Sequence, residues 1–271
     1  MLRLRVLTAT LGLPLVVLCL ILGPYPFAVF LGVVAAACTY ELCRLAPGLS
    51  RWDPFAVVAL AWAVLLASMR VLPLTAATQS VVVTVPVLVS LILLLRASGQ
   101  RRTFGQWSWA MGGALYVGWL LGLWGGLYVL PAGRNLVLFG MLTTFFYDTF
   151  AFFVGRALGR HKLALHLSAG KTWEGAAGGV VMALVGSLLI RAALIRFAGA
   201  FPFSVVATLV AAVFIAIAAQ TGDLVESALK RSAGVKDAGG ILPGHGGMLD
   251  RFDSLLFTGP MLYYFSLWVT A

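Results

Sequence analysis

Residues 223–253 read DLVESALKRSAGVKDAGGILPGHGGMLDRFD, and this polar stretch lies between two hydrophobic segments near the end of the chain. It contains five of the nine acidic residues of the protein, four Lys or Arg residues and six glycines. Charged side chains at a membrane border are costly unless they bind charged partners. Acids and bases in one loop suit a ligand that combines a metal ion with phosphate. The stretch therefore predicts the functional site, and the apolar segments around it predict the fold.

The overall composition indicates an integral membrane protein. Hydrophobic residues make up 61% of the 271 positions and charged residues only 10%, whereas a soluble domain contains about 25% charged residues. The formal net charge is +10, which basic loops facing anionic lipid explain better than nucleic-acid binding does. Cys19, Cys38 and Cys43 lie in or beside apolar segments without CxxC spacing, so we interpret them as small core residues.

We predict an all-α, polytopic membrane fold with about nine transmembrane helices. A spanning helix needs about 20 predominantly apolar residues. Apolar runs that approach this length cover residues 6–23, 26–43, 54–70, 72–95, 107–131, 135–155, 175–198, 202–222 and 254–271. The count becomes eight if one of the short runs, the third or the last, does not cross. The first run resembles a signal peptide but lacks a small-x-small cleavage site, so we expect a retained helix.

The positive charges predict the orientation, because cytoplasmic loops carry an excess of Lys and Arg. With a cytoplasmic N-terminus, fifteen Lys and Arg residues fall on the cytoplasmic side. The other side keeps four, namely Arg70, Arg134, Arg191 and Arg196. This orientation places the C-terminus outside, and it places the polar loops 156–174 and 223–253 together in the cytoplasm, where they can meet.

The acidic residues divide the chain into two parts. Glu41 and Asp53 lie in the region of the first cytoplasmic loop, and the other seven acids belong to the C-terminal half. We therefore expect residues 1–134 to form a transmembrane scaffold of about five helices. Residues 135–271 are expected to carry the chemistry.

The polar stretch combines a helical part and a glycine-rich part. Asp223, Glu226, Ser227 and Lys230 recur at helical spacing, which also suits a snorkelling helix end with internal ion pairs. The segment 238–247 contains too many Gly and Pro residues for a helix, and its exposed backbone N–H groups could cradle phosphate.

Two carboxylates on either side of this glycine-rich segment suit a metal ion. Asp223 precedes the segment and Asp250 follows it, and a hard cation with oxygen ligands, Mg²⁺ above all, fits such a pair. Asp250, Arg251 and Asp253 also stand at the start of the last span, where a helix N-terminus favours anions. Simple helix capping is the alternative interpretation of Asp250 and Asp253.

The polar stretch carries a pattern of fixed positions over 27 residues. It reads Ser227-x-x-Lys230-Arg231, Lys236-Asp237, Leu242-Pro243-x-His245-Gly246-Gly247-x-x-Asp250-Arg251-x-Asp253. This pattern resembles the signature of the CDP-diacylglycerol synthases, also called phosphatidate cytidylyltransferases. The chain length, the spans and the position of the motif are similar to that family as well, so the resemblance covers the whole chain.

A second segment agrees with this resemblance. Asp148 lies inside the apolar run 135–155, where an unpaired charge is expensive; a structural acid paired with a neighbour is the alternative. A run similar to one of the family follows it, as Gly155-Arg156, Gly159-Arg160-His161-Lys162-Leu163 and Ser168-x-x-Lys171-Thr172-Trp173-Glu174-Gly175. The family usually has Ser-Pro-Lys-Lys-Thr where this chain has Ser168-Ala169-Gly170-Lys171-Thr172. A P-loop is rejected because no GxxxxGK occurs, and the three histidines are too dispersed for zinc.

The resemblance implies an enzyme that joins CTP and phosphatidic acid, giving CDP-diacylglycerol and pyrophosphate in a bacterial inner membrane. The lipid phosphate is already anionic, so positioning and charge neutralisation supply most of the catalysis. Asp223 and Asp250 would hold Mg²⁺, to which a second metal or a monovalent cation could be added, with Asp148 and Asp253 as supporting acids. The residues that would contact CTP or the lipid phosphate are Lys162, Ser168, Lys171, Ser227, Lys230, Arg231, Lys236, His245, Gly246, Gly247 and Arg251.

Two other functions remain open at this point. A CTP-dependent lipid or polyprenol kinase would place similar charges beside similar spans, but it would release CDP instead of pyrophosphate. A transporter should carry polar residues near the middle of several spans, whereas ionisable residues within the spans here are almost confined to Asp148. The Trp- and Gly-rich run 107–126 also suits a close helix interface, such as that of a homodimer.

The orientation can be tested by thiol labelling. A cysteine placed near Lys162 should resist membrane-impermeant thiol reagents applied to intact cells, because the charge bias puts this loop in the cytoplasm. A cysteine near Arg134 should react. If the cysteine near Lys162 is labelled and the one near Arg134 is not, the predicted membrane orientation is reversed.

Overall fold

The computed structural model describes residues 12, 14–45, 53–72, 74–96, 104–199, 201–241 and 246–270. The chain forms two compact units. The first unit comprises Met1–Gly126 and Ala233–Asp250, and the second comprises Leu127–Ser232 and Arg251–Ala271. The glycine-rich part of the polar stretch therefore belongs to the same unit as the N-terminal helices, and its helical part belongs to the other.

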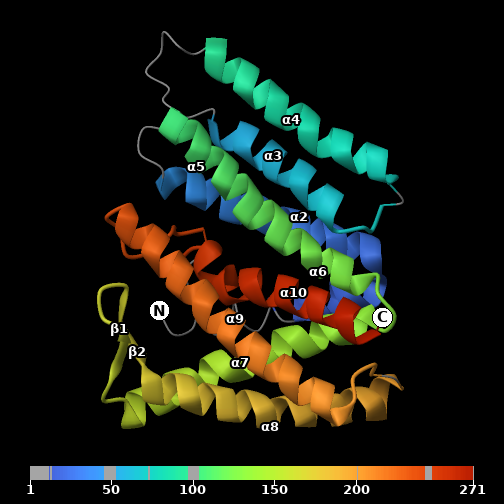
Figure 1. Ribbon diagram of the computed structural model, residues 1–271, viewed down its shortest axis with the longest axis vertical. Helices are drawn as coiled ribbons and strands as arrows, with labels where there is room; N and C mark the ends of the chain where they lie inside the picture. Colours follow the sequence, from blue (N-terminus) through green and yellow to red (C-terminus); the bar gives the residue numbers. More distant parts are fainter. Residues whose placement is uncertain are drawn as a thin grey trace. The chain divides into compact units, whose positions relative to one another are not determined.

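The first unit is built from helices (Figure 1). Residues 14–22 are helical. They are followed by α2 (Pro24–Leu45), α3 (Asp53–Ser68), α4 (Ala76–Arg96), α5 (Phe104–Ala114), the π-helical turn η1 (Leu115–Trp119) and α6 (Leu120–Tyr128). The last three elements run on as one helix, which crosses the boundary to the second unit at its end.

Glycines let this continuous helix approach α3 closely. A Cβ atom at Gly118 would lie 2.3 Å from the backbone oxygen of Ala61, and one at Gly122 would lie 1.8 Å from Ser68 Oγ. Gly125 faces Met69 in the same way. Small residues on one helix face allow such packing in membranes, where van der Waals contact drives association. These glycines of the run 107–126 thus pack against other parts of the same chain. A homodimer interface through this run stays a prediction.

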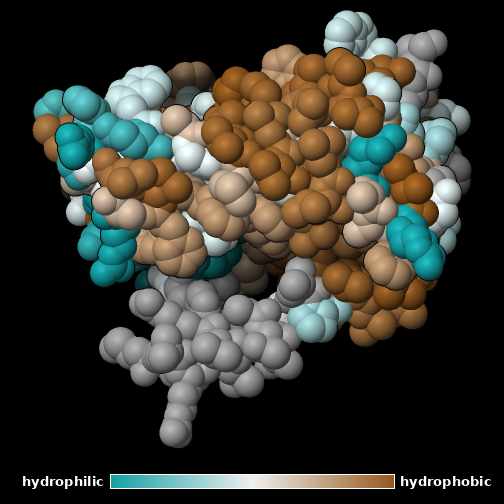
Figure 2. All heavy atoms as spheres, turned by 90° about the horizontal axis from the view of Figure 1, so that it is seen from below, coloured by the Kyte–Doolittle hydropathy of each residue, from teal (hydrophilic) through white to brown (hydrophobic). Residues whose placement is uncertain are grey.

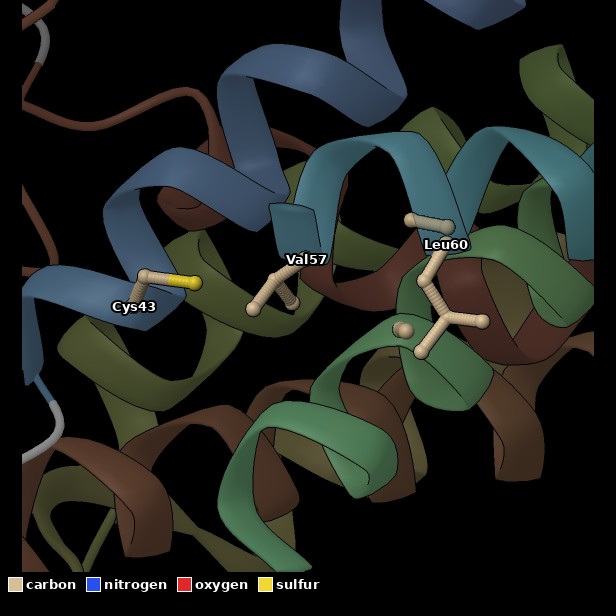
Figure 3. Close-up of a cluster of buried hydrophobic side chains, with 5 residues drawn as sticks. Cys43, Val57 and Leu60 are labelled. Carbon is tan, nitrogen blue, oxygen red and sulfur yellow. The ribbon is translucent and has the colours of Figure 1, made fainter. Parts of the chain in front are cut away.

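A buried apolar cluster joins α2, α3 and α5 (Figure 3). Cys43 of α2 points toward Val57 of α3, with Leu60 of α3 alongside. Trp109 Nε1 of α5 donates a hydrogen bond to the Leu42 oxygen at 3.1 Å, which satisfies a polar group inside the unit. Cys38 and Cys43 are buried and neither forms a disulfide, as expected of small core residues.

The second unit contains four long helices and one hairpin. They are α7 (Gly133–Leu158), β1 (Lys162–Ala164), β2 (Ser168–Thr172), α8 (Trp173–Ala198), α9 (Val205–Ser232) and α10 (Leu249–Thr270). The first two residues of α10, Leu249 and Asp250, belong to the first unit. The strands form a two-stranded antiparallel sheet in which Lys162 lies opposite Thr172 and Ala164 lies opposite Ser168. The predicted helical spacing of Asp223, Glu226 and Lys230 is confirmed, because α9 continues to Ser232 without a break.

Helices α7 and α8 pack along each other through glycines of α8 (Figure 1). A Cβ atom at Gly175 would lie 2.7 Å from the Ala151 oxygen, and one at Gly179 would lie 2.8 Å from the ring of Tyr147. Thr172 starts α8 as its N-cap, with its hydroxyl accepting the Gly175 N–H at 3.2 Å. This cap fixes the point at which the hairpin becomes a helix.

The all-α prediction is confirmed, apart from the short hairpin. Five helices of the described part are long and apolar enough to cross a membrane, and they begin at Pro24, Phe104, Gly133, Trp173 and Val205. Two shorter apolar helices, Pro54–Ser68 and Ala76–Ile92, accompany them. Figure 2 shows one face with a continuous apolar surface and hydrophilic groups toward its sides, as an integral membrane protein requires. The number of nine spans and the orientation stay predictions.

The glycine contact with α3 predicts a stability difference between two glycines of the continuous helix. Gly118→Ala should lower the melting temperature in detergent, because overpacking against backbone costs about 1–3 kcal/mol. Gly112→Ala is the matched control, since a Cβ there meets nothing within 4 Å and alanine favours helix. Equal melting temperatures for both variants would contradict the close contact.

Candidate functional site

An ion pair joins the two predicted polar loops within the second unit. Lys171 Nζ of β2 lies 2.5 Å from Asp223 Oδ2 of α9. Both side chains are partly buried, with 18% and 34% exposed, so the pair is screened less than a surface salt bridge would be. The two loops therefore meet at these residues, as expected for segments on the same side of the membrane.

Two further acids lie close to this pair. Asp148 of α7 and Asp253 of α10 both experience the negative charge of Asp223 and the positive charge of Lys171. Ser254 Oγ donates to Asp148 Oδ1 at 3.5 Å, and the Ser254 N–H donates to Asp253 Oδ1 at 2.7 Å. We call Asp148, Asp223 and Asp253 the three-acid cluster.

Packing between α9 and α10 supports the position of Asp253. A Cβ atom at Gly222 would lie 2.4 Å from the backbone oxygen of Asp253, so only glycine permits this approach. Asp223 follows on α9, and its charge acts on Asp253 of α10. The three-acid cluster thus combines one acid from each of three helices.

The next turn of α9 contains a buried ion pair. Glu226 is fully buried and pairs with Lys230 one turn later. Burying a carboxylate is costly unless it is paired, so Lys230 is held in place by this acid. Ser227 is also buried, and Arg231 is exposed. The pair agrees with the alternative interpretation of this helix end, in which ion pairs form within the helix.

The hairpin positions the predicted residues of the loop 156–174. Lys162 Nζ donates to the Ala169 oxygen at 2.7 Å, across the turn between the strands. Ser168 begins β2 and Lys171 lies near its end. Glu174 accepts the backbone N–H groups of Arg160 and His161 and contacts His161 Nδ1 at 2.5 Å. Polar side chains of this segment, Lys162 and Glu174, therefore stabilise the hairpin by hydrogen bonds.

The glycine-rich segment of the first unit is organised by two carboxylates. Asp250 Oδ2 accepts the N–H groups of Ala238 at 3.2 Å and Gly247 at 2.9 Å. Gly246 has φ +79°, a left-handed conformation that favours glycine. Glu41 Oε2 of α2 accepts the Leu249 N–H at 2.9 Å. Lys236 is exposed, and His245 lies outside the described residues.

The structure leaves the pairing of Asp223 with Asp250 as a prediction, because these residues belong to different units. In the part of the chain that the structure describes, no group of three His, Cys, Asp or Glu side chains is placed to hold a metal ion. The hydrogen bonds that Asp250 accepts from Ala238 and Gly247 show that this carboxylate has a structural role in the loop, whether or not it binds a metal ion.

Sequence reasoning missed the role of Glu41. It placed this residue in the region of a cytoplasmic loop and treated its part of the chain as scaffold, whereas Glu41 is buried within α2. A glutamate inside an otherwise apolar run was the available signal, since such acids usually have a specific partner. The partner, 208 positions away, could not be read from local spacing.

Comparisons with known proteins agree with the motifs. A sequence model of the cytidylyltransferase family matches residues 3–269. Phosphatidate cytidylyltransferase of Bacillus subtilis is 48% identical over 139 residues, which cover 48% of this chain and 49% of that protein. The enzyme of the same name from Brucella abortus is 44% identical over 135 residues, which cover 50% and 48%.

A third relative, the uncharacterized protein YnbB of Escherichia coli, is 40% identical over 162 residues, which cover 56% of this chain and 52% of that protein. The chain thus spans about half the length of the curated relatives it matches. Since the family match extends over nearly the whole sequence, this chain belongs to the cytidylyltransferase family.

Proposed function

We propose that the protein transfers the cytidylyl group of CTP to phosphatidic acid, forming CDP-diacylglycerol and pyrophosphate for phospholipid synthesis. The observation that carries this proposal is the name shared by relatives that are 44% and 48% identical to the chain. The three-acid cluster beside Lys171 supports it, because a reaction between two polyanions needs both metal-binding oxygens and cations.

The reaction requires little acid–base chemistry. A phosphate oxygen of the lipid attacks the α-phosphorus of CTP, and the bond from that phosphorus to the bridging oxygen of the β-phosphate breaks in line. The leaving pyrophosphate takes the electron pair. Both reactants are anionic, so the protein must hold them together against their repulsion. Lys171, Lys230, Lys236, Arg231 and Arg251 are the cations that we assign to this task.

The donor chemistry of the cluster fits Mg²⁺. Asp223 contacts Lys171, and Asp148 and Asp253 interact electrostatically with both, so a divalent cation would relieve the mutual repulsion of the three acids. Mg²⁺ is usually held by one or two carboxylates together with substrate phosphates. Asp223 would hold the ion together with Asp250, and the bound ion would neutralise charge on the CTP phosphates.

The protein side chains have separable tasks in this scheme. Lys171 spans the distance between the hairpin and α9, so it can orient a phosphate next to Asp223. Glu226 keeps Lys230 extended along α9. Asp148 and Asp253 orient the groups around Asp223. We assign a phosphate contact to the Gly246 backbone, because the Gly247 N–H already donates to Asp250.

The direct test uses purified protein, CTP labelled in the cytosine ring, phosphatidic acid and Mg²⁺. We expect a labelled lipid and stoichiometric pyrophosphate. A CTP-dependent lipid kinase would instead release labelled CDP and leave the lipid unlabelled. Vesicles that take up solute without either product would favour a transporter.

The metal hypothesis predicts the behaviour of two acids. Asp223→Asn and Asp250→Asn should each abolish most activity and weaken the Mg²⁺ dependence. The double variant should lose little more activity than either single variant, because the effects of residues that act as a unit are not additive. Asn at position 250 keeps an oxygen that can accept the Ala238 and Gly247 N–H groups, so the loop should survive. Asp53→Asn, outside both polar loops, serves as the control, and near-normal turnover by Asp250→Asn would exclude a metal role for that residue.

The cation hypothesis predicts losses at two lysines. Lys171→Ala and Lys236→Ala should each weaken catalysis by ~2–4 kcal/mol with the fold intact, because desolvated charge-assisted contacts to phosphate are strong. The measurement is kcat/KM for CTP. Arg196→Ala, an exposed basic residue near the end of α8, is the matched control. Full activity of both lysine variants would mean that these side chains only face lipid headgroups.

A further inference from the structure

Glu41 is a buried carboxylate that the proposed reaction does not use. It lies in α2 and is only 1% exposed. An ionised carboxylate away from water is costly unless hydrogen bonds compensate it. Glu41 Oε2 accepts one such bond from the Leu249 N–H at 2.9 Å, while Oε1 has no hydrogen-bond partner among the described residues. Because burying a charged residue in a membrane helix costs free energy, we expect Glu41 to have a specific role.

Each oxygen of this carboxylate lies against a glycine of the polar stretch. A Cβ atom at Gly239 would be 2.5 Å from Glu41 Oε1, and one at Gly247 would be 2.5 Å from Glu41 Oε2. The three nearest atoms to the Gly239 position all belong to the Glu41 side chain. A side chain at position 239 would therefore displace the Glu41 carboxylate, independently of any ligand.

The Leu249 N–H has a particular place in the fold. Leu249 is the first residue of α10, and the first N–H groups of a helix have no partner within the helix. Glu41 satisfies one of them from another helix of the same unit, and its negative charge is favourable at a helix N-terminus. It acts as a helix cap supplied from 208 positions away.

The same short segment carries Asp250. Its Oδ2 holds the Gly247 N–H, and a Cβ atom at Gly247 would lie 3.0 Å from that oxygen. Gly247 is therefore packed between the two carboxylates. Any shift of Glu41 would move Gly247 and Leu249, and with them the carboxylate of Asp250.

We propose that Glu41 is a positioning residue, which holds Gly239, Gly247 and Leu249 against α2 and thereby sets the position of the Asp250 carboxylate. The expected effect on turnover rests on the proposed function. The contacts of Glu41 with Leu249 and the two glycines do not depend on it. Glu41 contacts neither substrate nor metal in this scheme and acts through Asp250.

A double-mutant cycle tests this positioning role. In the parent protein, Gly239→Ala should lower kcat by roughly 10–100-fold, the usual cost of disturbing a supporting residue. In a Glu41→Ala background the same change should cost almost nothing further, because the atoms it would strike are gone. Gly32→Ala in α2 is the control, since a Cβ there meets nothing within 4 Å. An equal loss from Gly239→Ala in both backgrounds would overturn the inference.

The conservative variant separates positioning from mere stability. Glu41→Gln keeps an oxygen that can accept the Leu249 N–H, so it should retain much of the activity and a near-parental Mg²⁺ midpoint. Glu41→Ala should raise the Mg²⁺ concentration that gives half-maximal rate. If Glu41→Gln and Glu41→Ala both lower the melting temperature while kcat and the Mg²⁺ midpoint stay at the parental values, Glu41 is only structural.

Hydrogen exchange distinguishes failure of this inference from failure of the proposed function. Peptides that contain Leu249 should exchange faster in Glu41→Ala than in the parent protein, whatever reaction the protein catalyses. Unchanged exchange would refute the positioning role of Glu41 even in an active enzyme. Faster exchange in a protein that makes no CDP-lipid would support the positioning role of Glu41 and refute the proposed cytidylyl transfer.

Discussion

An ionised side chain carried by an apolar helix must find its partner inside the protein, because hydrocarbon offers none. This constraint selects the contacts that organise both polar segments. Lys171 pairs with Asp223, Lys230 pairs with the buried Glu226, and Glu41 accepts a backbone N–H of α10. Lys171 and Glu41 each find their partner on a second element, whereas Lys230 and Glu226 pair within α9. The contacts that satisfy these charges therefore also build part of the candidate site.

Glycine makes these partnerships geometrically possible. Gly222 brings α9 against the backbone of α10 near Asp253, and Gly175 brings α8 against α7 just after the N-cap Thr172. A side chain at either position would push the helices apart. The three-acid cluster depends on such approaches, because its members come from three different helices. Close helix packing and electrostatics are therefore coupled in the second unit.

The sequence predicts the helices and the polar motif well, because both depend on local patterns. The helical face from Asp223 to Lys230 follows from a periodicity of 3.6 residues, and the structure confirms it. The pairing of Lys162 with Thr172 in a hairpin and the buried role of Glu41 could not be predicted in this way. They depend on contacts that local spacing does not encode, and the contact of Glu41 with Leu249 joins residues 208 positions apart. The membrane orientation and the meeting of Asp223 with Asp250 remain predictions from charge and chemistry.

The span between Glu41 and Leu249 also imposes an order on biosynthesis. At about 5–20 residues per second, roughly 10–40 s separate the synthesis of the acid from that of its hydrogen-bond donor. The helix α2 therefore leaves the ribosome long before the contact that satisfies its buried carboxylate can form. A nascent chain that stops short of Leu249 holds an uncompensated acid in an apolar segment, which quality-control proteases can recognise as an unfinished product.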